Sequence, residues 1–169
     1  MTATIPVGLS LAEFNALDEP AAAELVATWA RIPAWSATVA AARPYPDRDR
    51  LLDTALETSR AWTWPEVEQA LATHPRLGER PPGAGSEADH SRREQSGVGE
   101  DDRAAFAAAN RAYEERFGRV LLIRAAGRSG AELLAIARSR LGNDEATERA
   151  ATTEQLREIA LARLREAVR

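Results

Sequence analysis

Apolar residues recur at intervals of three and four residues along nearly the whole chain, and this helical spacing constrains the fold more than any other feature. Only one segment, RVLLIRAAG at residues 119–127, is short, apolar and capable of forming a β-strand. A single strand cannot build a sheet by itself. The sequence therefore predicts an all-α protein, with residues 1–169 forming a single-domain helical bundle of about eight or nine helices.

Start and stop signals divide this pattern into separate helices. Ser10 is followed three residues later by Glu13, which is the capping-box pattern. Pro20 suits the first turn of the next helix, and a later helical pattern continues to Gly118. The expected helical segments are 10–18, 20–30, 33–46, 47–62, 64–74, a segment starting at 91, 100–118, 129–142 and 143–169.

One long irregular stretch, HPRLGERPPGAGSEADHSRREQSG at residues 74–97, interrupts the helices. It contains both histidines of the protein, four of its ten glycines and a Pro-Pro pair. Glycines let the backbone approach a ligand closely, whereas prolines limit its freedom. Because a long loop in a compact domain is often functional, we expect this Gly/Pro loop to line a site.

The composition excludes several kinds of chemistry. The chain has no cysteine, and all 22 of its basic side chains are arginine. It therefore has no thiolate nucleophile and no lysine to form a Schiff base. Proton transfer must come from the two histidines, the carboxylates or the two tyrosines.

Charge and hydropathy indicate neither nucleic acid nor a membrane as a partner. The net charge is −4, and no basic stripe stands out. No window approaches eighteen uninterrupted apolar residues, and the first residues lack the pattern of a signal peptide. We expect a cytoplasmic protein.

The two histidines have both structural and functional interpretations. His74 precedes Pro75 at the end of a helical pattern, so it is either a helix-terminal cation or a general acid–base group at a helix–loop junction. His90 lies in a polar run and is most simply a solvated loop residue. Both histidines with Glu87, Asp89 or Glu94 could form a metal site, but their spacing matches no familiar zinc pattern.

Ser91 and Glu94 stand at capping-box spacing, which gives Glu94 a structural interpretation. Arg163 is less easily explained. On a helical wheel it falls within the apolar stripe of the last helix, whereas Arg165 lies on the opposite face. A guanidinium on a core-facing stripe must extend to solvent, pair with an acid or bind an anion.

Four motifs stand out by their order and spacing: HPRLG at 74–78, SRREQSGV at 91–98, ANRAYEERFGRVLLIRAAGRS at 109–129 and LGNDEATERAATTEQLREIALARL at 141–164. Together they resemble a known family, the 2-oxo-4-hydroxy-4-carboxy-5-ureidoimidazoline (OHCU) decarboxylases of urate degradation. Weaker similarity, in LAEFNALD and ARIPAWSATVAAARPY, extends the resemblance over nearly the whole chain.

The resemblance implies that His74, Glu94 and Arg163 are catalytic and that Arg163 also clamps the substrate. The substrate contacts that it implies come from Pro75, Ser91, Arg92, Arg93, Glu94, Gln95, Leu121, Leu122, Ile123, Arg124, Ala125 and Arg163. In the 121–125 segment the contacts are expected from the backbone. The position before Ser91, often tryptophan in bacterial relatives, is His90 here, and Arg128 stays outside the implied catalytic set.

The activity implied by the resemblance agrees with the composition. The family's substrate carries its own electron sink, a ring carbon–nitrogen double bond beside the carbon that bears the carboxylate and hydroxyl. No cofactor and no metal are then needed. The resemblance implies two partners, a small-molecule ureidoimidazoline as substrate and a second copy of the chain in a homodimer. Two other classes stay open: a non-enzymatic helical interaction module and a metal-dependent hydrolase.

Overall fold

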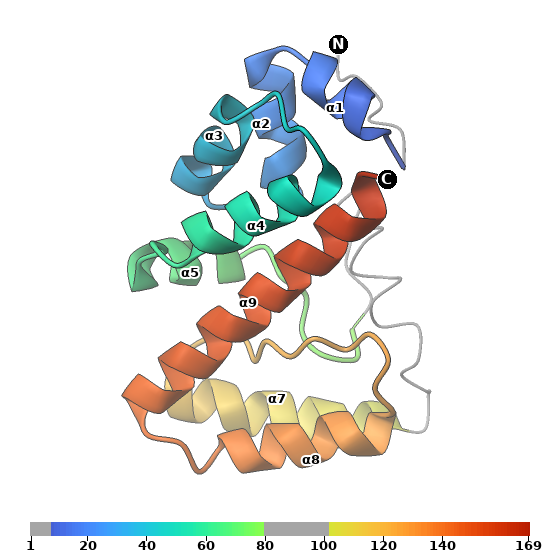
Figure 1. Ribbon diagram of the computed structural model, residues 1–169. Helices are drawn as coiled ribbons and strands as arrows, with labels where there is room; N and C mark the ends of the chain where they lie inside the picture. The colour runs from blue at the N-terminus through green and yellow to red at the C-terminus, as the bar shows by residue number, and fades with distance from the viewer. Residues whose placement is uncertain (1–7, 80–101) are drawn as a thin grey trace. The chain divides into compact units, whose positions relative to one another are not determined.

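The computed structural model describes residues 8–79 and 102–169 (Figure 1). These residues form eight helices and contain no named β-strand, so the all-α prediction is confirmed. They divide into two compact units. Unit 1 contains the described residues up to Val67 together with Arg157–Arg169, and unit 2 contains those from Glu68 to Leu156.

Unit 1 begins with helices whose first turns are capped by side chains. The predicted capping box is confirmed, because the Ser10 amide donates to Glu13 Oε2 at 2.8 Å and the Glu13 amide donates to Ser10 Oγ at 3.2 Å. Asp18 caps the next helix by accepting from the amide of Ala21 at 2.8 Å, and Pro20 lies in its first turn. The helices are α1 (Leu11–Ala16), α2 (Glu19–Ala27), α3 (Pro33–Ala41) and α4 (Arg48–Ser59).

The core of unit 1 is built from both ends of the chain. Each helix contributes buried apolar side chains, among them Phe14, Val26, Val39, Leu51 and, from the last helix, Leu164. A parallel β-bridge joins Leu9 to Val168, and the amide of Arg169 donates to the carbonyl of Leu9 at 2.7 Å. The last helix is therefore tied to the N-terminal helices by backbone pairing as well as by apolar packing.

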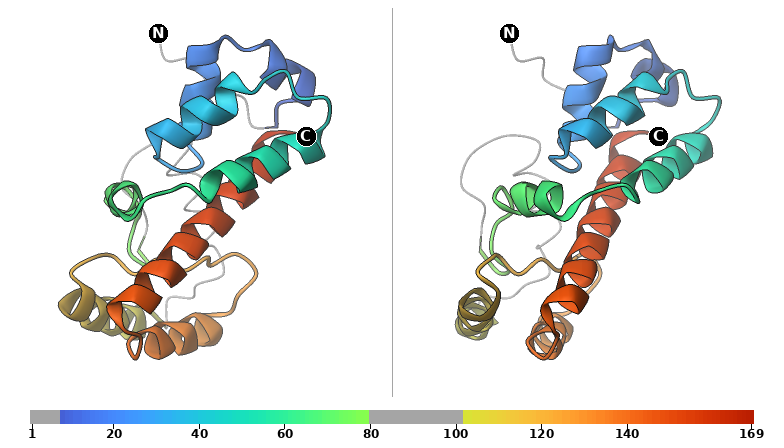
Figure 2. Two further views of the ribbon diagram at one scale, coloured as in Figure 1. Left: turned by 60° about the vertical axis from the view of Figure 1, so that its left-hand side comes forward. Right: turned by 90° about the vertical axis from the view of Figure 1, so that its left-hand side faces the viewer.

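Unit 2 contains the end of one helix, two complete helices, the first half of the last helix and a long non-helical connection. Helices α7 (Arg103–Phe117) and α8 (Gly130–Arg140) lie side by side (Figure 2). Helix α7 ends where predicted, at Gly118, whose φ of 67° is the left-handed conformation that favours glycine. The last helix, α9 (Glu145–Ala167), contributes its residues up to Leu156 to unit 2.

The connection between α7 and α8 contains the apolar segment that the sequence marks as strand-like. It crosses unit 2 without forming a helix (Figure 1) and has no strand partner within residues 8–79 and 102–169. Its side chains enter the apolar cluster of unit 2, which consists of Leu77, Phe106, Tyr113, Leu121, Ile123, Ala125, Leu133, Leu134 and Ala137.

Helix α5 (Trp64–Leu71) begins in unit 1 and ends in unit 2. Among the described helices, none has the length and apolar character needed to cross a membrane.

Candidate active site

His74 lies just after the end of α5 rather than within it. The predicted helix 64–74 ends at Leu71, three residues early. Beyond it the chain makes tighter turns, in which the amide of Thr73 donates to the carbonyl of Ala70 at 3.3 Å and that of His74 donates to Leu71 at 3.0 Å. Because Pro75 disfavours α geometry at the preceding residue, the chain leaves the helix before His74. The imidazole is half-buried at this junction.

The residues after His74 are held against α7 and the unit 2 core. Leu77 belongs to the apolar cluster, and its carbonyl accepts a hydrogen bond of 2.8 Å from the buried Asn110 side chain. Gly78 has a φ of 81°, and a Cβ there would lie 3.1 Å from the Cβ of Phe106. Both observations favour glycine at this position. The HPRLG motif is thus a fixed turn that presents His74 at the end of α5.

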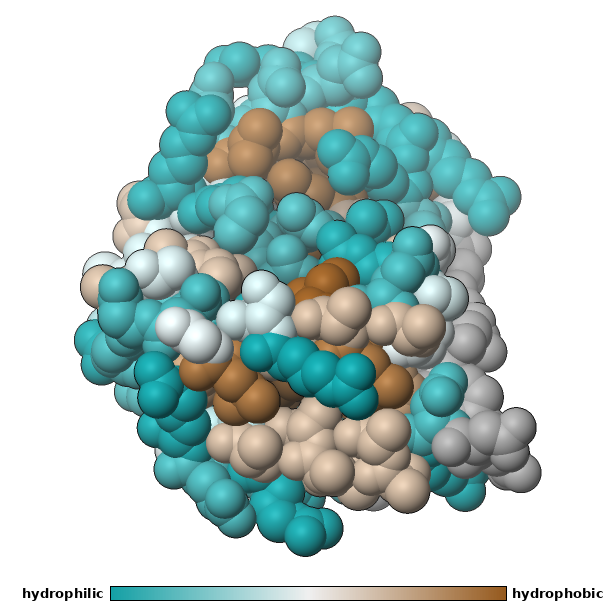
Figure 3. Space-filling model, turned by 90° about the horizontal axis from the view of Figure 1, so that it is seen from below, coloured by the Kyte–Doolittle hydropathy of each residue, from teal (hydrophilic) through white to brown (hydrophobic). Residues whose placement is uncertain are grey.

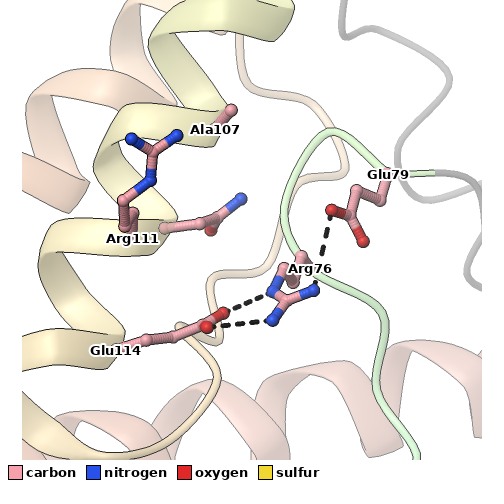
Figure 4. Close-up of a pocket in the computed structure, with 6 residues that line it drawn as sticks. Arg76, Glu79, Ala107, Arg111 and Glu114 are labelled. Atoms are coloured by element: carbon pink, nitrogen blue, oxygen red, sulfur yellow. Dashed lines mark hydrogen bonds and ion pairs between the residues drawn. The ribbon is translucent and has the colours of Figure 1, made fainter.

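A cavity of about 230 Å³ opens beside this turn (Figure 4). Across it, Arg76 binds Glu114 through two hydrogen bonds, of 2.5 Å from Nε and 3.0 Å from an Nη. These bonds from Arg76 hold the pKa of Glu114 below its ordinary value. The cavity is lined by Arg76, Glu79, Ala107, Asn110, Arg111 and Glu114.

The packing of the 121–125 segment indicates an extended backbone. Leu121, Ile123 and Ala125 pack in the same apolar cluster as Leu77 of the His74 turn. Alternate residues on one side are typical of extended backbone. The structure therefore brings two of the predicted site elements, the His74 turn and the 121–125 segment, onto one core.

Some backbone groups of this segment already have partners within the protein. The carbonyl of Leu122 accepts from Arg140 Nη1. The amide of Arg124 donates to Gln155 Oε1 at 2.9 Å, and its carbonyl accepts from Arg128 Nη1 at 2.8 Å. The carbonyl of Ala125 accepts from the amide of Arg128 at 3.1 Å. Among the described residues, no hydrogen bond occupies the amide or carbonyl of Ile123.

Arg140 links this segment to a buried ionic network that was not predicted from the sequence. Its guanidinium binds Glu148, with an Nε to Oε1 distance of 2.9 Å, and Glu148 is fully buried. The same carboxylate accepts from the Tyr113 hydroxyl at 2.6 Å and from Asn143 Nδ2 at 2.9 Å. The helical wheel that singled out Arg163 could also have found Arg140, which continues the apolar stripe of Leu133 and Ala137 on α8.

Arg163 is buried, as its position on the wheel predicted, with only 1% of its surface exposed, whereas Arg165 is exposed. It belongs to unit 1. Its Nη1 donates to the carbonyls of Thr28 and Trp29, each at 3.4 Å. Thr28 is the C-cap of α2, so the guanidinium faces the end of a helix where carbonyls are unpaired and a positive charge is favourable.

Other predicted site residues, from Ser91 to Gln95, lie outside the described residues, as do His90 and the other members of the alternative metal site, Glu87 and Asp89. Pro75 is described and is half-buried in the His74 turn. Within residues 8–79 and 102–169, no group of three or more histidine and acidic side chains is arranged to hold a metal ion.

The arrangement of helices is shared with two solved structures. A crystal structure of OHCU decarboxylase in the presence of (S)-allantoin matches with a TM-score of 0.69 and 18% identity, over 82% of this chain and 92% of that chain. A crystal structure of (S)-allantoin synthase matches with a TM-score of 0.67 and 15% identity, over 95% of this chain and 54% of that chain. This chain thus spans about half the length of the second protein. These similarities define the class of fold, an all-helical OHCU decarboxylase fold.

The family follows from the sequence. The sequence profile of the family OHCU decarboxylase matches residues 15–165, which include most of both units. No curated protein matches the chain. The chain belongs to the OHCU decarboxylase family, as its four motifs predicted.

Proposed function

We propose that this protein catalyses the cofactor-independent decarboxylation of 2-oxo-4-hydroxy-4-carboxy-5-ureidoimidazoline to (S)-allantoin in urate degradation. The observation that carries this proposal is the family match over residues 15–165, and a carboxy-lyase is the class of enzyme that it supports. Further support comes from the contacts that the predicted site residues make in unit 2.

The backbone of Ile123 is one part of the 121–125 segment that is suited to bind the substrate. In extended backbone the amide and carbonyl of one residue point to the same side, and neighbouring residues point to opposite sides. The carbonyl of Leu122 binds Arg140, and the amide and carbonyl of Arg124 bind Gln155 and Arg128. The amide and carbonyl of Ile123 then point to the opposite side of the segment. They place a donor beside an acceptor, and this pair complements the C=O and N–H of a ring amide or ureido group.

The side chain of Arg124 suits a negatively charged substrate. Its Nε is buried and has no hydrogen-bond partner in the described part of the chain. A buried donor without a partner is unfavourable, and a bound carboxylate or carbonyl oxygen would satisfy it. The substrate of the proposed reaction carries such a carboxylate. The resemblance implies only a backbone contact at Arg124, so a contact from its side chain is an addition to that set.

The proposed reaction needs proton transfer and orientation from the protein. The bond from the ring carbon to the carboxylate breaks and carbon dioxide leaves. The electron pair forms a carbon–carbon double bond, and the pair of the ring carbon–nitrogen double bond moves to nitrogen, which takes up a proton. The hydroxyl loses its proton, and a proton is delivered to one face of the neighbouring carbon. His74 is proposed to handle these protons, because histidine both accepts and releases protons near neutral pH. Glu94 orients or polarises His74 or the substrate, Arg163 binds an anionic or carbonyl oxygen, and Ser91 and Gln95 bind the ureido and ring amides.

The experiment that tests the function is a coupled assay. Urate, urate oxidase and the hydrolase that follows it generate the unstable substrate, with and without this protein, and circular dichroism follows the chirality of the product. We expect rapid formation of (S)-allantoin that chelators do not affect. Unchanged decay of the intermediate would favour the interaction module, and loss of activity with chelator would favour a metal-dependent hydrolase.

Glu94→Gln separates the two interpretations of Glu94. Glutamine serves a capping box nearly as well as glutamate, so the melting temperature should hardly change. A neutral amide cannot stabilise a protonated His74 or accept a substrate proton, so turnover should fall on the order of 10²-fold or more. Thermal melting and the coupled assay on one preparation check both statements. Turnover close to that of the unmodified protein would show that Glu94 is a helix cap only.

Arg163→Leu should weaken the binding of (S)-allantoin by about 10- to 100-fold, because a charged hydrogen-bond donor is lost. The carbonyls of Thr28 and Trp29 also lose their cationic donor. We therefore expect the free energy of unfolding to fall by about 1 kcal/mol. Isothermal titration calorimetry and urea denaturation measure the two effects.

Arg165→Leu is the matched control for Arg163→Leu, because Arg165 lies on the exposed face of the same helix. Arg165→Leu should change neither the affinity for (S)-allantoin nor the free energy of unfolding. If Arg163→Leu lowers stability but leaves the affinity for (S)-allantoin intact, Arg163 is a structural residue of unit 1 and its proposed role in binding is wrong.

We also propose that residues 1–169 act as one domain and that the protein is a cytoplasmic homodimer. The family match spans most of both units, which supports one functional domain. Apolar surface is visible from below (Figure 3). The exposed residues of α7 and α8 include the alanines Ala104, Ala107, Ala108, Ala131 and Ala135. Light scattering should give about twice the chain mass of 18.3 kDa, and a monomer would contradict the proposal.

A further inference from the structure

Two side chains form hydrogen bonds with the backbone of Arg124, one with its amide and one with its carbonyl. Gln155 lies in the first half of α9, and its Oε1 accepts a hydrogen bond of 2.9 Å from the amide of Arg124. Arg128 Nη1 donates to the carbonyl of Arg124 at 2.8 Å and also to Gln155 Oε1 at 3.4 Å. The two side chains and the backbone of Arg124 thus form a closed set of hydrogen bonds, here called the Arg124 clamp.

The clamp replaces the strand partner that the 121–125 segment lacks in the described structure. An extended segment usually keeps its conformation through the hydrogen bonds of a neighbouring strand. Here side chains of α8, of α9 and of the connection bind one edge of the segment, at Leu122 and Arg124. Alternation of the backbone then directs the amide and carbonyl of Ile123 to the opposite edge.

We propose that Gln155 and Arg128 are positioning residues for the reaction, which act by fixing the direction of the Ile123 amide and carbonyl. This inference rests on the proposed function, because it takes Ile123 as a substrate contact. It assigns neither side chain to direct contact with the substrate. The resemblance leaves Arg128 outside the implied catalytic set, and in the structure its side chain donates hydrogen bonds to Arg124 and Gln155.

Gln155→Leu removes the oxygen that accepts a hydrogen bond from the Arg124 amide but keeps a side chain of similar size. Gln155→Glu keeps an accepting oxygen. We expect Gln155→Leu to raise KM for the substrate and Kd for (S)-allantoin by about tenfold, with kcat changed much less, because substrate binding loses preorganised groups. Gln155→Glu should stay within about threefold of the unmodified protein, because a carboxylate oxygen also accepts the Arg124 amide. A purely structural defect would instead lower the active fraction, and therefore kcat, at unchanged KM.

Arg128→Met tests the other half of the clamp. It keeps the apolar stem but removes the donor to the Arg124 carbonyl. We expect a rise in KM similar to that of Gln155→Leu. Because both side chains act through the same residue, the double variant should be little worse than either single variant. A double variant whose KM rises by the product of the two single effects would contradict a shared clamp.

The control is Gln69→Leu, the same substitution at an exposed position of α5. It should leave KM, Kd and kcat unchanged. Suppose that the unmodified protein is active. If Gln155→Leu then has the same KM as the unmodified protein, or if it lowers kcat alone, the positioning role is wrong while the proposed function stands. If the unmodified protein neither turns over the substrate nor binds (S)-allantoin, the proposed function fails, and the role of the clamp in it fails as well.

Discussion

Replacement of His74 by asparagine is expected to lower turnover by about 10²- to 10⁴-fold, which is the range that a general acid–base group contributes. The reaction must take a proton from a hydroxyl and deliver one to carbon, and the chain has no cysteine or lysine for this task. Asparagine keeps a polar side chain of similar reach but does not exchange protons near neutral pH. The coupled assay, run in excess of the preceding enzymes, measures the loss.

The fold should tolerate this change. The His74 hydrogen bond to Leu71 is made by the backbone amide, which asparagine retains. The turn is also fixed by Leu77 and by the ion pair between Arg76 and Glu114, neither of which involves the imidazole. We therefore expect nearly unchanged thermal melting. His90→Asn is the matched control, since it removes the other histidine, and similar losses from the two substitutions would overturn the assignment of His74.

Local signals in the sequence predicted the helices well. The capping box of Ser10 and Glu13, the proline in the first turn of α2 and the glycine after α7 all depend on residues a few positions apart. Such signals are contained within a short stretch of chain. The end of α5 was predicted three residues too late, because apolar spacing continued into a turn that Pro75 keeps out of the helix.

The burial of Arg163 was also predictable, because one helix carries all the information that a helical wheel uses. Its partners were not, because the carbonyls of Thr28 and Trp29 lie about 135 positions earlier in the chain. The Arg124 clamp shows the same limit. Gln155 stands 31 positions after Arg124, and no sequence pattern pairs a glutamine on a helix with one amide of a distant extended segment.

The chemistry of the site entered through the resemblance rather than through the spacing of residues. Ser91 and Glu94 match an ordinary capping box, and His74 alone matches a helix-terminal cation. The structure adds that two predicted site elements, the His74 turn and the 121–125 segment, pack on the same apolar cluster. Leu77 and the side chains of Leu121, Ile123 and Ala125 share one core, so the His74 turn and the 121–125 segment are fixed by the same packing.

The largest expected effect on stability is that of Arg140→Met. Arg140 and Glu148 are both buried, and the carboxylate also accepts hydrogen bonds from Tyr113 and Asn143. Removal of one partner of a buried ion pair leaves the other charge without compensation, which costs about 3–5 kcal/mol. We expect a decrease of this size in the free energy of unfolding, measured by urea denaturation at neutral pH.

Arg138→Met is the control on the same helix, because Arg138 is exposed on α8. Its effect should stay within about 0.5 kcal/mol, as for most surface substitutions. The double variant Arg140→Met, Glu148→Leu removes both charges and should recover part of the stability lost in Arg140→Met. If the two single arginine variants are equally stable, the buried pair contributes nothing specific and the prediction is wrong.

Acid titration of the unmodified protein tests the same pair. Burial acts to raise the pKa of Glu148, but hydrogen bonds from Arg140, Tyr113 and Asn143 outweigh it and hold the pKa below its ordinary value of 4.5. A carboxyl group with a lowered pKa stabilises the fold at pH values above its ordinary pKa, and this contribution is lost as the pH falls through the lowered pKa. The free energy of unfolding should therefore decline as the pH drops below about 4.5. We expect Glu148→Gln to be less stable at neutral pH and to lack that part of the decline. An equally steep decline in both proteins would mean that other carboxylates cause it.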